Sequence, residues 1–196
     1  MKLTEKNLIF DFNSSLSIKY DETEYYRKEF QTIQNYPFLK DRDYSKEEVE
    51  EILKKNIFMS AVDFITIKDK HGYLIEVKDY RDSSIEKKRP WQELIPILIK
   101  KVLSTLSSII PMKIMTSNID EKNIAENFSQ ITQLTIVFHI ELPSKLSKQQ
   151  MAFFRRDKLE LELKRKLLPI CNNLYVVSTM SKVSLPWTIK DVNATP

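Results

Sequence analysis

The sequence predicts a three-layer α/β domain in which a central mixed β-sheet is flanked by helices on both faces. Three observations support this class. Segments with strand and helix patterns alternate along the chain, a strand–turn–strand unit surrounds its single glycine, and 42% of its residues are hydrophobic. A chain of 196 residues can build one substantial core and is short for two ordinary domains, so we expect a single domain over residues 1–196.

The first half of the chain predicts two strand pairs and two helices. Residues 7–19 are extended around an Asn13-Ser14-Ser15 turn, which indicates a hairpin. Asp21 can cap a helix over residues 22–34, and Ser45 can cap a second one over residues 46–55. Residues 58–67 and 73–78 are apolar strands joined by a turn over residues 69–72.

The second half predicts two long helices and three strands. Residues 94–110 form a mostly buried helix that ends before Pro111. Strands follow over residues 113–116 and 132–141. A charged helix over residues 147–168 and a final core strand over residues 174–179 complete the pattern.

Composition narrows the function classes. The net charge of +4 favours a polyanionic partner without requiring one. A single glycine excludes the phosphate loops of nucleotide-binding proteins, and a lone Cys171 excludes an internal disulfide. We expect a cytoplasmic protein with no membrane span, because the N-terminus lacks an apolar signal and Lys100 and Lys101 interrupt the most apolar segment.

Charged residues converge within the predicted strand pair. Glu76 and Lys78 share a strand face, and a four-residue turn would place Asp63 opposite Lys78 and on the same face as Glu76. Such a buried trio is costly unless a metal compensates. We therefore expect Mg²⁺, with Mn²⁺ as a substitute, bound by Asp63, Glu76 and the Val77 carbonyl. Lys78 would orient or deprotonate water, or neutralise the phosphate.

The pattern Val62-Asp63, twelve residues, then Glu76-Val77-Lys78 resembles the active-site motif of the PD-(D/E)xK, or restriction-endonuclease-like, nuclease superfamily. Val62 replaces the proline of that motif. The run from Leu74 to Arg81 is also similar to a segment of a group of uncharacterised bacterial proteins. The resemblance implies a restriction-endonuclease-like fold and DNA cleavage.

It also implies an acidic residue from an early helix that completes the metal site. Glu22 is our candidate and Glu24 competes with it, while Glu48 and Glu51 are less favoured.

Basic residues suggest contacts to nucleic acid. Lys87, Lys88 and Arg89 precede Trp91 and could hold phosphates beside a stacked base, although a solvated loop with a core tryptophan fits equally well. Lys100 and Lys101 are adjacent on the long helix, so one of them should face the site. The sequence does not determine which one, and we take Lys101 as the candidate.

The sequence thus predicts a Mg²⁺-dependent DNA nuclease. The alternative is a catalytically silent nucleic-acid-binding or scaffold subunit on the same fold. A homodimer is plausible because cutting two strands takes two sites, and so is a role as the cleavage component of a larger bacterial defence or repair assembly.

Overall fold

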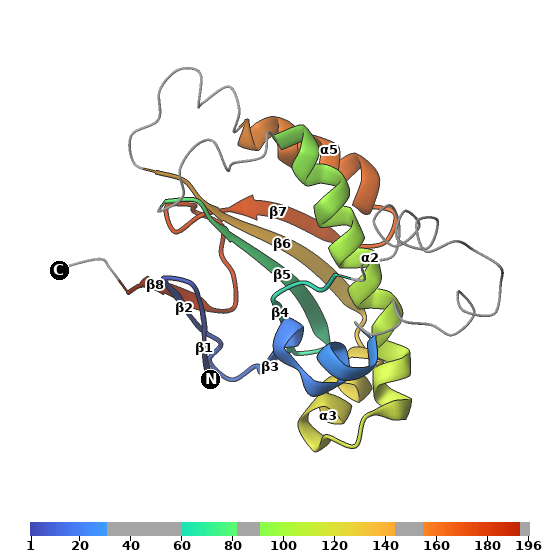
Figure 1. The fold of residues 1–196 in the computed structure, drawn as a ribbon. Coiled ribbons are helices and arrows are strands. Elements are labelled where there is room, and N and C mark those ends of the chain that lie inside the picture. The colour runs from blue at the N-terminus through green and yellow to red at the C-terminus, as the bar shows by residue number, and fades with distance from the viewer. Residues whose placement is uncertain (31–59, 82–90, 144–154, 193–196) are drawn as a thin grey trace, which may run out of the picture.

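A five-stranded mixed sheet runs through the middle of the molecule (Figure 1). The structure is a computed structural model that describes residues 1–30, 60–81, 91–143 and 155–192. Strands follow one another in chain order across the sheet; β3, β4 and β5 are antiparallel neighbours, and β5, β6 and β7 are parallel neighbours. Their bounds are β3 Leu16–Lys19, β4 Phe64–Lys68, β5 His71–Asp79, β6 Gln133–Glu141 and β7 Asn173–Val177. The predicted α/β class with a mixed sheet is confirmed.

Three helices cover one face of this sheet (Figure 1). They are α2 Trp91–Met115, α3 Ile119–Phe128 and α5 Arg156–Leu167, and α2 packs against both of the others. Leu98 of α2 and Leu163 of α5 share one buried cluster with Leu74 and Ile136 from the sheet. Burying this apolar layer is the main stabilising contribution on the helix side.

A small antiparallel sheet covers the other face. It consists of β1 Lys2–Glu5, β2 Leu8–Asp11 and β8 Thr188–Asp191, in the order β1-β2-β8. Phe10, Phe12 and Trp187 pack there against Tyr73 and Ile75 of the large sheet. Over the described residues, the second face is therefore covered by strands, which corrects the prediction of helices on both faces.

The β4–β5 turn is tighter than predicted. Lys68 pairs with His71, so only Asp69 and Lys70 form the turn, and their φ angles of 50° and 60° fit a type I′ hairpin. The predicted turn paired residue 68 with residue 73. The observed register differs from the predicted one by two residues. Because side chains alternate between the two faces with a period of two, each side chain of the pair stays on its predicted face.

Gly72 lies within β5 and not in the turn. A Cβ at this position would lie 2.7 Å from Ile131 Cδ1 and 3.1 Å from Phe128 Cε2. The glycine therefore allows the segment after α3 to pack closely on the sheet, and no positive φ requires it.

The predicted hairpin over residues 7–19 is wrong. Strand β2 pairs with β1 and β8, whereas β3 pairs with β4, so the Asn13–Ser15 segment carries the chain from one sheet to the other. A 3₁₀ turn, η1 (Tyr20–Glu22), follows β3, and helical structure starts at Glu24 and includes a π-helical turn, η2 (Tyr26–Phe30). The rest of the helix predicted over residues 22–34, and the whole of the one over residues 46–55, lie outside the described residues.

Helix α2 is longer than predicted and contains both Pro96 and Pro111. It continues through residues 113–115, where a strand was predicted. Pro111 cannot donate a backbone hydrogen bond, and the next residue, Met112, is completely buried in the helix-side core. Of the described helices, α2 alone is long and apolar enough to span a bilayer. Only 39% of its most apolar window is buried, so the prediction of a mostly buried helix is wrong, although its buried residues belong to the helix-side core.

The remaining differences concern short or capped elements. Strands β1 and β8 and helix α3 were not predicted; the Asn118 side chain caps α3 by accepting hydrogen bonds from the backbone N–H of Asp120 and Glu121. Strands β6 and β7 confirm the predictions over residues 132–141 and 174–179. Helix α5 confirms the second half of the helix predicted over residues 147–168, and residues 147–154 lie outside the description.

Candidate active site

Asp63, Glu76 and Lys78 meet at the point where β4 begins. Asp63 directly precedes β4, and the pair Phe64–Ile75 places it beside Glu76 instead of opposite Lys78. The Val77 backbone N–H donates a hydrogen bond to Asp63 Oδ2 at 2.5 Å. The strand register therefore fixes Asp63 against the β5 backbone, with Glu76 and Lys78 on the helix side of the sheet.

Two lysines bind the Glu76 carboxylate. Lys78 Nζ pairs with Glu76 Oε1. Lys101 Nζ, from α2, lies 2.7 Å from Oε1 and 2.8 Å from Oε2, and 3.7 Å from Asp63 Oδ1. The Glu76 side chain is fully buried, whereas those of Lys78 and Lys101 are 25% and 17% exposed. Solvent thus reaches the site along the two lysine side chains and not at the Glu76 carboxylate.

Two further carboxylates approach from the N-terminal segment. Oxygen atoms of Glu5, Asp21 and Asp63 all lie within 4.8 Å of one another. Asp21 sits in η1, which is tied to the site because the Tyr20 N–H donates to the Asp63 carbonyl at 2.8 Å. Asp21 Oδ1 is buried and has no hydrogen-bond partner among the residues that the structure describes. We call Asp21, Asp63, Glu76, Lys78 and Lys101 the helix-side cluster.

The charges of this cluster shift its pKa values. Burial, together with the nearby Glu76 charge, raises the pKa of Asp63 to about 7, although Lys101 and Lys78 act in the opposite direction. Burial and Glu5 raise the pKa of Asp21 to about 6. Burial acts to lower the pKa of Lys78, but the charge and hydrogen bond of Glu76 outweigh it and raise that pKa above its ordinary value. Strongly shifted acidic groups gathered at one place are typical of functional sites.

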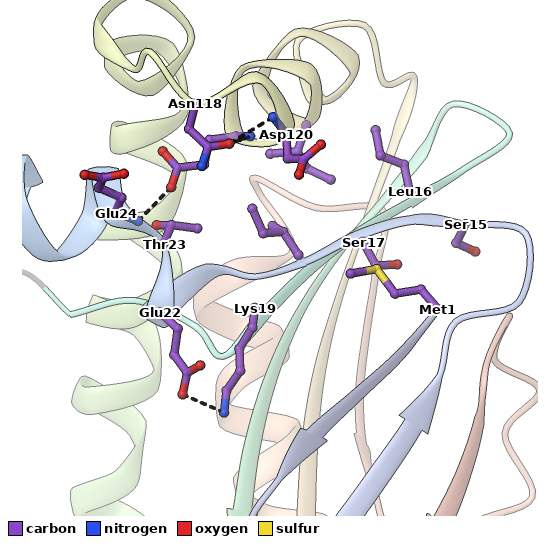
Figure 2. Close-up of a pocket in the computed structure, with 13 residues that line it drawn as sticks. Met1, Ser15, Leu16, Ser17, Lys19, Glu22, Thr23, Glu24, Asn118 and Asp120 are labelled. Carbon is purple, nitrogen blue, oxygen red and sulfur yellow. Dashed lines mark hydrogen bonds and ion pairs between the residues drawn. The ribbon is translucent and has the colours of Figure 1, made fainter.

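Glu22 does not join the cluster. Its carboxylate pairs with Lys19 Nζ at 2.9 Å, as Figure 2 shows, and its side chain is 48% exposed. Glu24 pairs with Lys28 on the surface. Both glutamates line a pocket between β3 and α3, so the structure does not bring the predicted Glu22 into this cluster and brings Asp21 there instead. Glu48 and Glu51 lie outside the described residues.

Asp21 escaped prediction because aspartate before a helical segment fits an N-cap. In the structure, Asp21 lies inside a 3₁₀ turn and not at a helix N-cap, because helical structure starts only at Glu24. A useful signal was its proximity to the extended segment ending at Lys19, which pairs with the strand that follows Asp63.

The other predicted contacts divide into two groups. Lys87, Lys88 and Arg89 lie outside the described residues. Of the two adjacent lysines of α2, Lys101 contacts the site, through Glu76 and Asp63. Trp91 is partly buried and packs against the helix-side core, as the core alternative predicted. The Val77 side chain packs on the other face of β5, and its carbonyl remains a predicted ligand.

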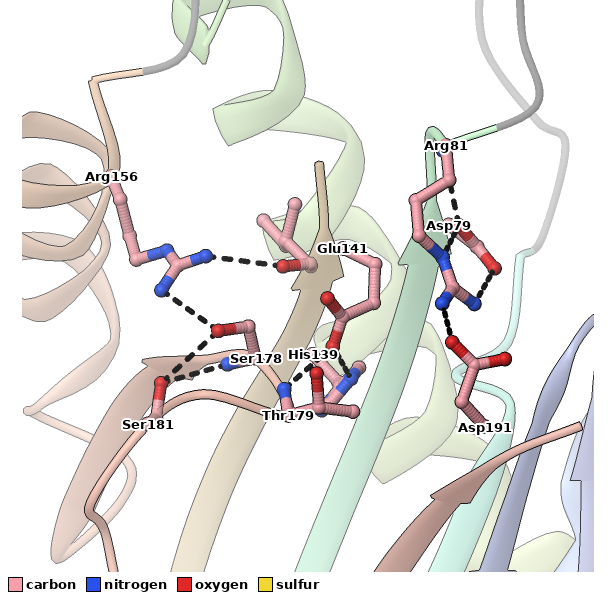
Figure 3. Close-up of polar contacts among 10 residues, drawn as sticks. Asp79, Arg81, His139, Glu141, Arg156, Ser178, Thr179, Ser181 and Asp191 are labelled. Carbon is pink, nitrogen blue, oxygen red and sulfur yellow. Dashed lines mark hydrogen bonds and ion pairs between the residues drawn. The ribbon is translucent and has the colours of Figure 1, made fainter. Parts of the chain in front are cut away.

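A second charged cluster lies on the opposite face of the same strand end (Figure 3). Arg81 donates to both oxygens of Asp79, with Nε 2.9 Å from Oδ1 and Nη2 2.7 Å from Oδ2, and it also pairs with Asp191. Glu141 Oε1 accepts from the Thr179 N–H at 2.6 Å and lies 2.8 Å from His139 Nε2. We call Asp79, Arg81, His139, Glu141 and Asp191 the sheet-side cluster.

Comparisons with known proteins give one distant likeness. No family model matches the chain, and no solved structure matches it. The chain is similar to a cysteine–tRNA ligase of Neisseria meningitidis, with 27% identity over a match that covers 95% of this chain and 29% of the ligase. The chain thus spans less than a third of the length of this relative.

Proposed function

We propose that this chain is a metal-dependent nuclease that hydrolyses phosphodiester bonds of DNA. The observation that carries the proposal is the convergence of Asp63, Glu76 and Lys78 on one face of β5, beside the unpartnered Asp21 oxygen. Two acidic residues and a lysine in this arrangement fit the motif of the PD-(D/E)xK superfamily. The consecutive mixed sheet supports assignment to a restriction-endonuclease-like fold.

The residues present fit a hard divalent cation. Every side chain offered as a ligand is a carboxylate, and the Val77 carbonyl remains a predicted backbone ligand; oxygen ligands of both kinds suit Mg²⁺ and its substitute Mn²⁺. Asp63 and Glu76 would hold the ion as the motif implies, and Glu5 and Asp21 offer further carboxylate oxygens, because those of Glu5, Asp21 and Asp63 lie within 4.8 Å of one another. The unpartnered Asp21 oxygen and the raised pKa values of Asp21 and Asp63 both indicate negative charge that the described protein groups compensate incompletely. When bound, the ion would polarise the phosphate and acidify a water molecule.

Lys78 is the residue best placed to act on the substrate. Its side chain is partly exposed, and its ammonium pairs with the buried Glu76 carboxylate. Because its pKa is raised, Lys78 stays protonated at neutral pH. This favours donation of hydrogen bonds to the developing phosphate charge, or to the attacking water, over deprotonation of that water.

The first experiment is a cleavage assay on purified protein. Supercoiled plasmid and single-stranded DNA are incubated with Mg²⁺, Mn²⁺ or EDTA, beside Glu76→Gln and Lys78→Ala. We expect cleavage only with metal, and a loss of about 10²-fold to 10³-fold in each variant. Because the relative is by name a tRNA ligase, a tRNA substrate belongs in the same panel.

The competing function is a catalytically silent nucleic-acid-binding or scaffold subunit. Retained DNA binding without metal-dependent cleavage would favour it. Glu160→Gln, on the far helix α5, serves as a control for a carboxylate lost outside the site and should cleave like the unmodified protein. We further propose a cytoplasmic location, and a second copy of the chain or a larger assembly as partner.

A further inference from the structure

Lys101 occupies the place between the two central carboxylates of the site. Its ammonium lies within hydrogen-bond distance of both Glu76 oxygens and 3.7 Å from Asp63 Oδ1. It reaches this point from α2, a helix that packs in the helix-side core. A positive charge held by two carboxylates is the arrangement that a bound cation would also adopt.

Neutralising Glu76 does not by itself require Lys101. Lys78 already pairs with Glu76 Oε1 from the same strand. A second ammonium adds desolvation and side-chain entropy costs, so one buried carboxylate with two lysine partners calls for a further reason. The two lysines differ in their partners. Among the described contacts, Lys101 alone pairs with both Glu76 oxygens and with Asp63.

Metal and Lys101 would compete for the same lone pairs. A carboxylate has about four acceptor positions, and three contacts from the two lysines already engage Glu76. A divalent ion bound to Glu76 and Asp63 would repel an ammonium at its present place. Binding therefore requires Lys101 to move.

We propose that Lys101 is a resident cation that holds Glu76 and Asp63 together in the metal-free protein and is displaced when a divalent ion binds. This inference rests on the proposed function. The displaced ammonium, still tethered to α2 beside the site, becomes available to pair with the substrate phosphate. Lys101 is then a positioning residue that weakens metal affinity and couples metal binding to substrate binding.

The test measures the affinity for Mn²⁺ alone by titration, without substrate. Lys101→Met and Lys101→Gln are compared with the unmodified chain, and Lys100→Met is the matched control, since it removes the same charge from the neighbouring position of α2. We expect both Lys101 variants to bind Mn²⁺ at least about tenfold more tightly, and the control to change by less than about twofold. Equal or weaker binding by both Lys101 variants overturns the inference.

The outcomes separate this inference from the proposed function. If the unmodified protein binds Mn²⁺ and the Lys101 variants bind no more tightly, the inference alone fails. If none of the four proteins binds Mn²⁺ at millimolar concentration, the metal site fails, and the inference fails with it. Binding that appears only in the Lys101 variants supports the inference.

A second measurement uses the unmodified protein and does not depend on how the variants fold. In a crystal structure with Mn²⁺ bound, Lys101 Nζ should lie beyond hydrogen-bond distance of both Glu76 oxygens. An ion bound in the site with both contacts retained would contradict displacement. Thermal unfolding with and without Mn²⁺ gives an independent reading, because a ligand that binds the native state raises the melting temperature.

Discussion

The two faces of the β5 end carry charged clusters that differ in how their carboxylates are compensated. In the sheet-side cluster, burial acts to raise the pKa of Asp79, but hydrogen bonds and charge from Arg81 hold it below its usual value. Burial likewise acts to raise the pKa of Glu141, and bonds with His139 and Thr179 keep it low. In the helix-side cluster, by contrast, the pKa values of Asp63 and Asp21 are raised to about 7 and about 6.

This difference separates carboxylates that stabilise the fold from carboxylates held at a cost. A group whose pKa is lowered on folding stabilises the native state when ionised, and a group whose pKa is raised destabilises it. The structure holds carboxylates of both kinds at the same end of β5. Retained destabilising charge is typical of a site that binds something else.

The largest effect should follow from breaking the sheet-side cluster. Glu141→Ala leaves the Thr179 N–H and His139 Nε2 without their carboxylate partner in a buried setting. We expect the free energy of unfolding, measured in urea, to fall by about 3 kcal/mol. Glu162→Ala, which breaks only a surface pair with Arg165, should cost less than about 0.5 kcal/mol. Similar losses in the two variants would contradict the stabilising role of Glu141.

The next effect concerns the pH dependence of stability. Because the pKa of Asp63 is raised on folding, the native state binds more protons than the unfolded state between about pH 4 and about pH 7. Its contribution to stability therefore falls as pH rises through this window. In the unmodified protein, Asp63 should lower the free energy of unfolding by about 2 kcal/mol between pH 5 and pH 8. Asp63→Asn, which keeps Glu76, Lys78 and Lys101 around it, should abolish this decrease.

Asp79→Asn should change the pH dependence of stability in the opposite direction. The pKa of Asp79 is lowered on folding, so its stabilisation is present above the unfolded pKa and is lost as pH falls through the folded pKa. Denaturant titrations of both variants over a pH series check the pair. A pH profile of Asp63→Asn that coincides with that of the unmodified protein would exclude the proposed cost of Asp63.

A smaller effect, on the affinity for Mn²⁺, distinguishes Asp21 from Glu22. Asp21→Asn removes the charge beside Asp63 and Glu5, so Mn²⁺ affinity should fall by about tenfold. Glu22→Gln, which changes an exposed side chain paired with Lys19, should leave the affinity within about twofold. Calorimetric titration of the two variants decides between them, and a larger loss for Glu22→Gln would restore the assignment made from the sequence.

Much of the strand pair and its charged face could be predicted because side-chain alternation is local. The turn length was wrong by two residues, yet Asp63, Glu76 and Lys78 still converge because an even shift preserves the strand faces. The placement of Asp63 beside Glu76 required the true register. The alternation of side chains thus determines which residues share a face of the strand pair, and the turn length determines which residues lie opposite each other across it.

The rest depends on contacts between distant segments. The sheet formed by β1, β2 and β8 joins the two ends of the described chain, and no local period indicates that pairing. The selection of Lys101 over Lys100 depends on the rotation of α2 against the sheet, which its buried residues determine only together with their partners. Helix α3 is different, since Asn118 followed by Glu121 is a local capping signal that could have been recognised.

The most direct test of the account is the position of a bound ion. Crystals soaked in Mn²⁺ are measured for anomalous scattering, which locates the metal without reference to activity. We predict a peak in the helix-side cluster, between the carboxylates of Asp63, Asp21 and Glu76, and none in the sheet-side cluster. A peak only beside Asp79 or Glu141, or no peak at saturating Mn²⁺, would contradict the assignment of the helix-side cluster as a metal-dependent active site.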